Sequence, residues 1–256
     1  RTDYLRKYSQ LAARFGPAGV GVETVINKWE AAFPEDEEML AAKFSFHLAK
    51  SQTTEVKAME QDKYLGNAPV LNLQDSLGKK MNYFEVTTYD DEEFSLATKE
   101  IDKAIGLNPN RLDLRFIKTA ALLGYEKDSP DMTLANLKAL ADYNGHNHPV
   151  WEYPGLTVDD AFFTSAIQEY CVAFYRIGSP NSYEAFRSLS EKMLEYYPDN
   201  TLFLSNLGSY YLVYKKDDKT AQKYYSKVLK INPKDYTAIK NCVIMARNEK
   251  NVKLEK

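Results

Sequence analysis

The feature that most constrains this chain is a pair of helix-forming segments in residues 201–233 that closes on an Asn-Pro pair. Apolar and small residues recur at the spacing of one helix face, first before a Lys-rich turn and then after it. Gly208 and Ala221 are small enough to let two helices approach closely, and Pro233 ends the second helix because proline disfavours helix in the preceding residue. The two packing faces are Leu204, Leu207, Gly208 and Tyr211, followed by Ala221, Tyr225 and Val228.

A second copy of this pattern lies in residues 94–109. Its small and apolar residues have the spacing of the second helix in the 201–233 unit, and it also ends on Asn-Pro. Repetition at a period of about 34 residues predicts stacked helix pairs, in which each pair buries its face against its neighbours. The matching residues are Ala97, Ile101, Ala104 and Asn108-Pro109, with weaker closings at Phe33-Pro34 and Tyr197-Pro198.

This order of residues resembles the signature of the tetratricopeptide repeat (TPR) family. That signature has a large residue, Leu-Gly and Tyr in the first helix, then Ala, an aromatic residue, a small residue and a closing Pro in the second. The 201–233 unit fills those positions in order. It departs from the signature by one extra residue between Gly208 and Ala221, and by Val228 where Ala is usual.

The resemblance implies an all-α fold, a TPR-like right-handed α-α superhelix of about five helix pairs plus a C-terminal capping helix. We expect one domain over residues 1–256, with the capping helix at about 234–249 and a polar end beyond it. Besides the two helices of the 201–233 unit, the expected helices cover residues 3–14, 20–32, 37–50, 91–107, 111–125, 131–144, 158–177 and 181–196.

An insertion at about 51–90 interrupts the helical pattern. Residues 70–74 and 81–87 are β-prone and alternate in polarity, and the segment 75–79 between them has turn composition. We therefore expect a small β-hairpin near 70–87, packed on the helices because a lone hairpin is marginal in water. Its Asp75-Ser76-Leu77-Gly78-Lys79 turn is similar to that of bacterial, often exported TPR proteins with an inserted hairpin.

Charge and hydropathy argue against two classes of protein. The 33 basic and 36 acidic residues give a net charge of -3, without the basic stripe typical of nucleic-acid binders. No apolar run approaches the roughly 18 residues of a membrane span. The sequence begins at Arg1 rather than Met, so we expect a processed chain, which leaves exported, periplasmic and cytoplasmic locations open.

Catalytic and metal-binding motifs are missing from the sequence, which contains no P-loop, dinucleotide fingerprint, nucleophile elbow or His-Glu-x-x-His. We expect no catalytic residue, no cofactor and no resident metal. The alternative is a metal or active site in a polar loop at 144–152, where His146 and His148 stand near Glu152.

The two cysteines, Cys171 and Cys242, test the repeat alignment. Each falls on the first helix of a pair, two repeats apart, which predicts a separation on the order of 20 Å. A disulfide needs Cα atoms within about 7 Å, so we expect no bond between them.

The TPR resemblance implies a binding groove lined by first-helix residues that do not face the packed core. The groove would hold a protein or peptide ligand, making the protein a scaffold or adaptor. The alternatives are a structural or oligomerisation component of a larger assembly and, less favoured, an enzyme; ligand and oligomeric state stay open. Carrying the family's groove positions over gives Ile117, Ala121, Gln168, Val172, Tyr175, Ser205, Ser209, Leu212, Lys240, Ile244 and Arg247.

Overall fold

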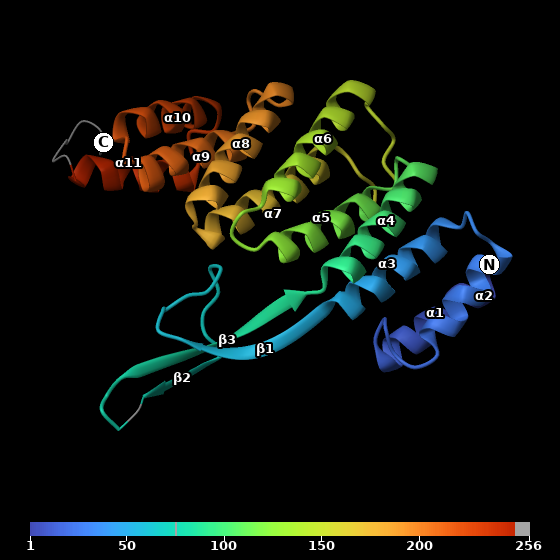
Figure 1. Cartoon of the computed structure of the whole chain (residues 1–256). Coiled ribbons are helices and arrows are strands. Elements are labelled where there is room, and N and C mark those ends of the chain that lie inside the picture. Colours follow the sequence, from blue (N-terminus) through green and yellow to red (C-terminus); the bar gives the residue numbers. More distant parts are fainter. Residues whose placement is uncertain (75, 249–256) are drawn as a thin grey trace. The chain divides into compact units, whose positions relative to one another are not determined.

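The computed structural model describes residues 1–74 and 76–248, and the expected all-α, TPR-like fold with a small inserted sheet is confirmed (Figure 1). Eleven α-helices lie in that part of the chain, and most begin or end within two residues of their expected bounds. They are α1 (Thr2–Phe15), α2 (Val22–Ala32), α3 (Glu37–Ser51), α4 (Asp91–Leu107), α5 (Leu112–Glu126), α6 (Asp131–Asn147), α7 (Asp160–Ile177), α8 (Pro180–Tyr196), α9 (Thr201–Ser209), α10 (Asp218–Ile231) and α11 (Tyr236–Asn248).

The contacts of the chain divide it into two compact units. Unit 1 comprises residues 1–125 and 149–158, and unit 2 comprises residues 126–148 and 159–256. The segment 149–158 belongs with unit 1 because Glu152 pairs with the chain before α5. The Glu152 N–H donates to the Asn110 carbonyl at 2.8 Å, and the Leu112 N–H donates to the Glu152 carbonyl at 3.0 Å. The single domain expected over 1–256 stays a prediction.

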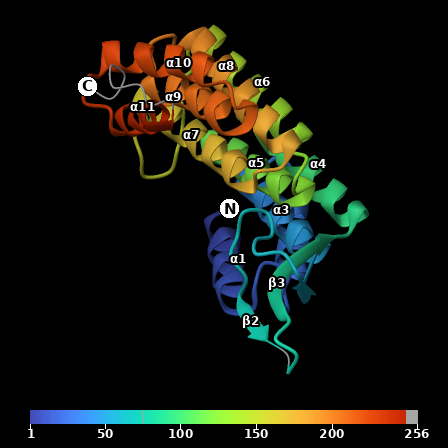
Figure 2. The ribbon, with the colours of Figure 1, turned by 90° about the vertical axis from the view of Figure 1, so that its left-hand side faces the viewer.

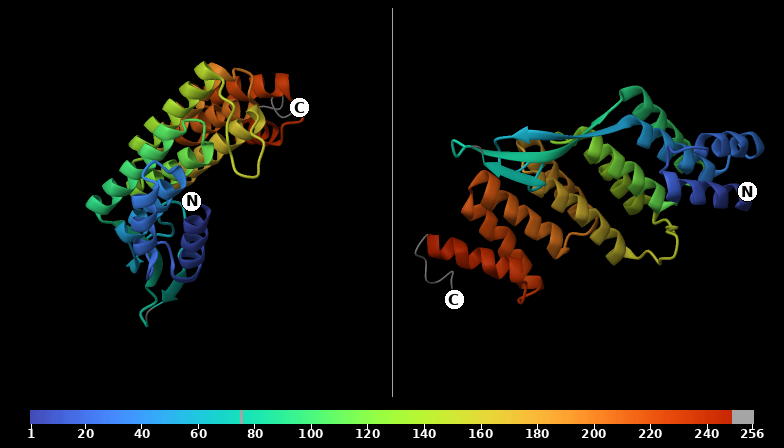
Figure 3. Two further views of the ribbon diagram at one scale, coloured as in Figure 1. Left: turned by 90° about the vertical axis from the view of Figure 1, so that its right-hand side faces the viewer. Right: turned by 90° about the horizontal axis from the view of Figure 1, so that it is seen from below.

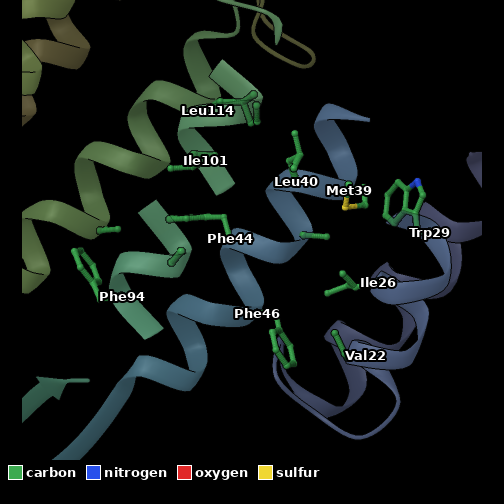
Figure 4. Packing of buried hydrophobic residues seen from close by; sticks show 14 of the residues in the cluster. Val22, Ile26, Trp29, Met39, Leu40, Phe44, Phe46, Phe94, Ile101 and Leu114 are labelled. Carbon is green, nitrogen blue, oxygen red and sulfur yellow. The ribbon is translucent and has the colours of Figure 1, made fainter. Parts of the chain in front are cut away.

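The core of unit 1 is built by α2, α3, α4 and α5 (Figure 4). The helix-face spacing expected for α4 is present, since Ala97, Ile101 and Ala104 are fully buried. Asp36 and Asp90 cap the N-termini of α3 and α4 by accepting hydrogen bonds from backbone N–H groups of the first turn. The acidic residues before these helices therefore stabilise helix ends. The largest buried side chains here include Trp29, Met39, Phe44, Phe94 and Leu114.

The repeat pair of unit 2 is formed by α9 and α10 and packs as the sequence predicts. Ala221, Tyr225 and Val228 are fully buried on α10, and Gly208 faces the Tyr225 ring. The extra residue noted in this unit does not lengthen the turn. Instead, α9 continues into a π-helical turn, η1 (Tyr210–Lys215), and such a turn accommodates one more residue than an α-helical turn.

The insertion forms a three-stranded antiparallel sheet in unit 1, with the strand order β1-β3-β2. The expected hairpin corresponds to β2 (Leu71–Gln74) and β3 (Lys80–Tyr89), and Asp75 of its turn lies outside the described residues. The long partner of β3 was not expected. It is β1 (Gln52–Met59), which continues directly from α3 and pairs with β3 from Gln52↔Tyr89 to Met59↔Asn82.

Two smaller expectations need correction or lie partly beyond the described residues. His146 was expected in a loop, but α6 extends to Asn147 and His148 is the C-cap, with a left-handed φ of 43°. The expected capping helix is α11, and position 249 at its far end lies outside the described residues.

Both thiols of unit 2 are free and buried, and Cys171 offers a direct chemical test of the fold. Burial raises the pKa of Cys171 to about 12, against a smaller lowering by the Ser190 hydroxyl, whose oxygen lies 3.8 Å from Sγ. Because the thiolate is the reactive form, Cys171 should resist alkylation in the native protein at about pH 8 and react once the protein unfolds. Mass spectrometry of alkylated peptides measures this, and native labelling at the unfolded rate would contradict it.

Candidate functional site

The candidate site is the face of unit 2 formed by the first helices of successive pairs, α7, α9 and α11, which we call the first-helix face. In Figure 2 these helices form one layer of unit 2, and the second helices α6, α8 and α10 form the other. Figure 3 shows the same helices from two further sides. Side-chain hydrogen bonds join the first helices to one another, directly from α7 to α9 and through Tyr225 from α9 to α11.

A row of amides and hydroxyls crosses this face from α7 to α11. The amides of Gln168 and Asn206 exchange two hydrogen bonds, at 3.0 Å and 2.7 Å. The Asn206 Nδ2 also donates to the Ser190 hydroxyl at 3.1 Å. Further along, Tyr225 Oη lies 2.9 Å from Ser209 Oγ and accepts from Asn241 Nδ2 at 2.7 Å. We call Gln168, Asn206, Ser209, Tyr225 and Asn241 the amide–hydroxyl row.

The Tyr225 phenol sets the direction of the bonds around it. Burial raises the pKa of Tyr225 to about 12, outweighing the lowering by hydrogen bonds from Ser209 and Asn241. The phenol is therefore neutral at physiological pH and carries a proton of its own. Since Asn241 already donates to it, Tyr225 can donate to Ser209, which leaves the Ser209 hydroxyl proton available for a bound molecule.

Ser205 stands one helical turn before Ser209 on α9. It is buried, and within the described part of the chain its hydroxyl oxygen has no hydrogen-bond partner. A buried polar group without a partner costs roughly 1–3 kcal/mol. The hydroxyl is thus the least satisfied polar group beside the amide–hydroxyl row.

Apolar and cationic groups flank the row. Val172 on α7 and Ile244 on α11 are exposed, as are Lys240 and Arg247 on α11. Both of these cations belong to one helix, α11.

The four remaining groove positions do not extend the row or its surroundings. Tyr175 packs against Tyr183 and Phe186 of α8, with ring centroids 5.6 Å and 5.2 Å apart, and Leu212 packs on the core around Tyr225. Ile117 is exposed but belongs to unit 1, and Ala121 is buried, so neither is part of the first-helix face.

Sequence reasoning missed Asn206 and Asn241. Each stands one residue before a packing residue of its helix, Leu207 and Cys242, and so occupies the same repeat position in α9 and α11. An asparagine recurring next to the packing face in two consecutive first helices was the available signal.

The polar loop considered for metal binding is not organised as a metal site in the structure. His146 lies on α6, and its Nε2 is 3.3 Å from the Tyr196 hydroxyl. Throughout residues 1–74 and 76–248, no group of three or more His, Cys, Asp or Glu side chains is placed to hold a metal ion. No helix within those residues is both long and apolar enough to cross a membrane.

Comparison with known proteins finds a distant likeness among solved structures. No protein-family model matches the chain, and no curated protein matches it. Among solved structures it is similar to MamA (41-end) from Desulfovibrio magneticus RS-1, with 16% sequence identity and a TM-score of 0.38. The match covers 92% of this chain and 96% of that one. Similarity at this level says nothing about ligand or activity.

Proposed function

We propose that the protein is a binding scaffold whose unit 2 holds an internal peptide segment of a protein partner on the first-helix face. The observation that carries the proposal is the amide–hydroxyl row, which runs across three consecutive first helices. Amides and hydroxyls present both donors and acceptors, as a peptide backbone does. The partly exposed members of the row, Gln168, Ser209 and Asn241, can therefore exchange hydrogen bonds with a chain laid across them. The buried members, Asn206 and Tyr225, hold them in place.

The flanking residues limit the kind of peptide. Val172 and Ile244 are exposed and follow the row members Gln168 and Asn241 by about one turn, so they offer apolar contacts to ligand side chains beside the row. Among the groove positions, only Lys240 and Arg247 are cations, and both lie on α11, so these positions do not offer a cluster of cations from several helices to grip a terminal carboxylate. These features favour an internal, mostly neutral segment with apolar side chains and an acidic residue at one end.

Placing two charges on the apolar flanks tests the proposal. A library of displayed random peptides selected on the wild-type protein should yield binders. Their Kd should rise by roughly tenfold or more in the double variant Val172→Glu and Ile244→Glu, since burying an unpaired carboxylate against a ligand is costly. Fluorescence anisotropy with labelled peptides measures the affinities.

A matched control exists on the opposite layer of unit 2. Met132 on α6 and Ile231 on α10 are 45% and 46% exposed, against 47% and 41% for Val172 and Ile244. The variant Met132→Glu with Ile231→Glu should bind the selected peptides within about twofold of wild type. Failure to select any binder, or equal loss in both variants, would refute the first-helix face as the site.

The cationic end is tested separately. Changing both Lys240 and Arg247 to Glu should raise the Kd of the acidic peptides in the selected set and leave the Kd of the neutral peptides unchanged. Lys223 and Lys230 on α10 have the same spacing in sequence and serve as the charge-matched control.

A further inference from the structure

The inference concerns the free edge of the inserted sheet in unit 1 and is independent of peptide binding by unit 2. In the order β1-β3-β2, strand β1 is an edge strand, and nearly all of its side chains are exposed. Figure 1 shows β1 leaving α3 and β3 entering α4, so the sheet extends beyond the ends of these helices. A long, exposed edge strand is a template for pairing with another strand.

The register identifies which backbone groups of β1 face outward. The Asp90 N–H donates to the Ser51 carbonyl at 2.8 Å, so Ser51 and Asp90 form a hydrogen-bonded pair next to the β1–β3 ladder. Hydrogen-bonded pairs alternate along an antiparallel ladder. Glu55 and Lys57 therefore direct their backbone groups to β3, whereas those of Thr54, Val56 and Ala58 point to the open edge.

The two faces of β1 differ in chemistry. Val56 and Ala58 lie on the same face of the sheet as Tyr83, because residues directly paired across an antiparallel ladder share a face. Leu71 is paired with Tyr83 and belongs to this face too, and it is exposed, as is Val56. Glu55 and Lys57 lie on the other face, with their carboxylate and ammonium groups 3.5 Å apart.

These residues make the edge self-complementary in one register. When two copies of β1 pair antiparallel about a twofold axis at Val56, each Glu55 stands opposite the second copy's Lys57. Both charge pairs fall at non-hydrogen-bonded positions, where facing side chains are closest, and Val56 meets its own equivalent on the face that it shares with Tyr83. A twofold axis at residue 55 or 57 would instead place Glu opposite Glu or Lys opposite Lys.

We propose that the protein forms a homodimer by antiparallel pairing of β1 with β1 of a second copy, centred on Val56. Roughly six backbone hydrogen bonds would form between the outward-facing residues 54, 56 and 58 of the two strands. The two three-stranded sheets become one six-stranded sheet, with the two Val56 side chains at its centre. The interface is isologous and closed, so assembly stops at the dimer.

Charge reversal tests this register in solution. Glu55→Lys alone and Lys57→Glu alone should each raise the dimer dissociation constant by roughly tenfold or more, because attractive cross-strand pairs become repulsive. The double variant with both changes restores Lys opposite Glu and should dimerise like wild type. An equimolar mixture of the two single variants should form heterodimers. Light scattering and sedimentation equilibrium measure the masses.

A cysteine variant reports the register directly. In Val56→Cys the two Cα atoms would be about 5.5 Å apart, within disulfide range, so a cross-linked dimer should form on oxidation. The control Ala58→Cys lies on the same edge and face, but the Cα atoms of residue 58 in the two copies would be about 13 Å apart. Native Cys171 and Cys242 are buried. A wild-type monomer at millimolar concentration, a dimer insensitive to charge reversal, or equal cross-linking at 56 and 58 would each overturn the proposal.

Discussion

Replacing Gly208 with alanine should lower the free energy of unfolding of unit 2 by about 2–3 kcal/mol, the cost of overpacking a tight core. A Cβ at this position would lie 2.7 Å from two atoms of the Tyr225 ring and 3.0 Å from a third. The ring is fully buried, and its hydroxyl is held by Ser209 and Asn241, so it cannot move without breaking hydrogen bonds. Chemical denaturation followed by circular dichroism measures the change.

Gly106 on α4 provides the contrast. A Cβ there meets no atom within 4 Å, so Gly106→Ala should leave stability unchanged or raise it by up to about 1 kcal/mol through reduced chain entropy. Since both variants make the same chemical change in a helix, their difference isolates the contact with Tyr225. Equal midpoints for the two variants would mean that α9 and α10 do not pack through Gly208.

The helices could be predicted because their signals are local. The Asn-Pro closings and the 3.6-residue period fix where α4 and α10 end, and the small residues Gly208 and Ala221 mark where helices touch. Strand β1 gives only a weak signal, because nearly all of its side chains are exposed and its residues alternate in polarity only over Glu55 to Ala58. It is a strand because β3 pairs with it, and long-range pairing cannot be read from a single segment.

In the candidate site too, the positions of some residues could be predicted from the sequence, but their hydrogen bonds could not. The repeat alignment pointed to Gln168 and Ser209, since groove positions follow from sequence spacing. It could not show that Gln168 shares its amide with Asn206, or that Tyr225 reaches Ser209 and Asn241 from the second helix. Those bonds depend on the approach of neighbouring helices in three dimensions. The repeat alignment also included Ser205, which the structure places below the surface.

Replacing Arg111 with methionine should destabilise unit 1 by about 3–5 kcal/mol, the usual cost of removing one partner from a buried ionic cluster. The Arg111 side chain is 8% exposed and joins α3 to the start of α5. One guanidinium nitrogen donates to Glu37 and Glu38 at 3.1 Å and 2.9 Å, and two others donate to Asp113 at 2.8 Å each. Hydrogen bonds to Asp113 are the main reason that the pKa of Arg111 is raised, so the cation is permanent.

The loss in this variant arises from the carboxylates left behind. Without Arg111, the like charges of Glu37, Glu38 and Asp113 repel one another in a partly buried site. The deficit relative to wild type should therefore shrink when added salt screens these charges. Denaturant unfolding at low and high salt concentration tests this dependence, and a deficit independent of salt would point to lost packing instead.

Arg187→Met is the control that separates buried from surface ion pairs. Arg187 contacts Glu184 and Glu191 on its own helix, α8, and its side chain is 32% exposed. Ion pairs of this kind contribute about 0–1 kcal/mol, because solvent screens them and holding long side chains costs entropy. Methionine retains most of the apolar stem at both sites. The expected result is a large loss for Arg111→Met and a small one for Arg187→Met, since only Arg111 neutralises carboxylates from two different helices.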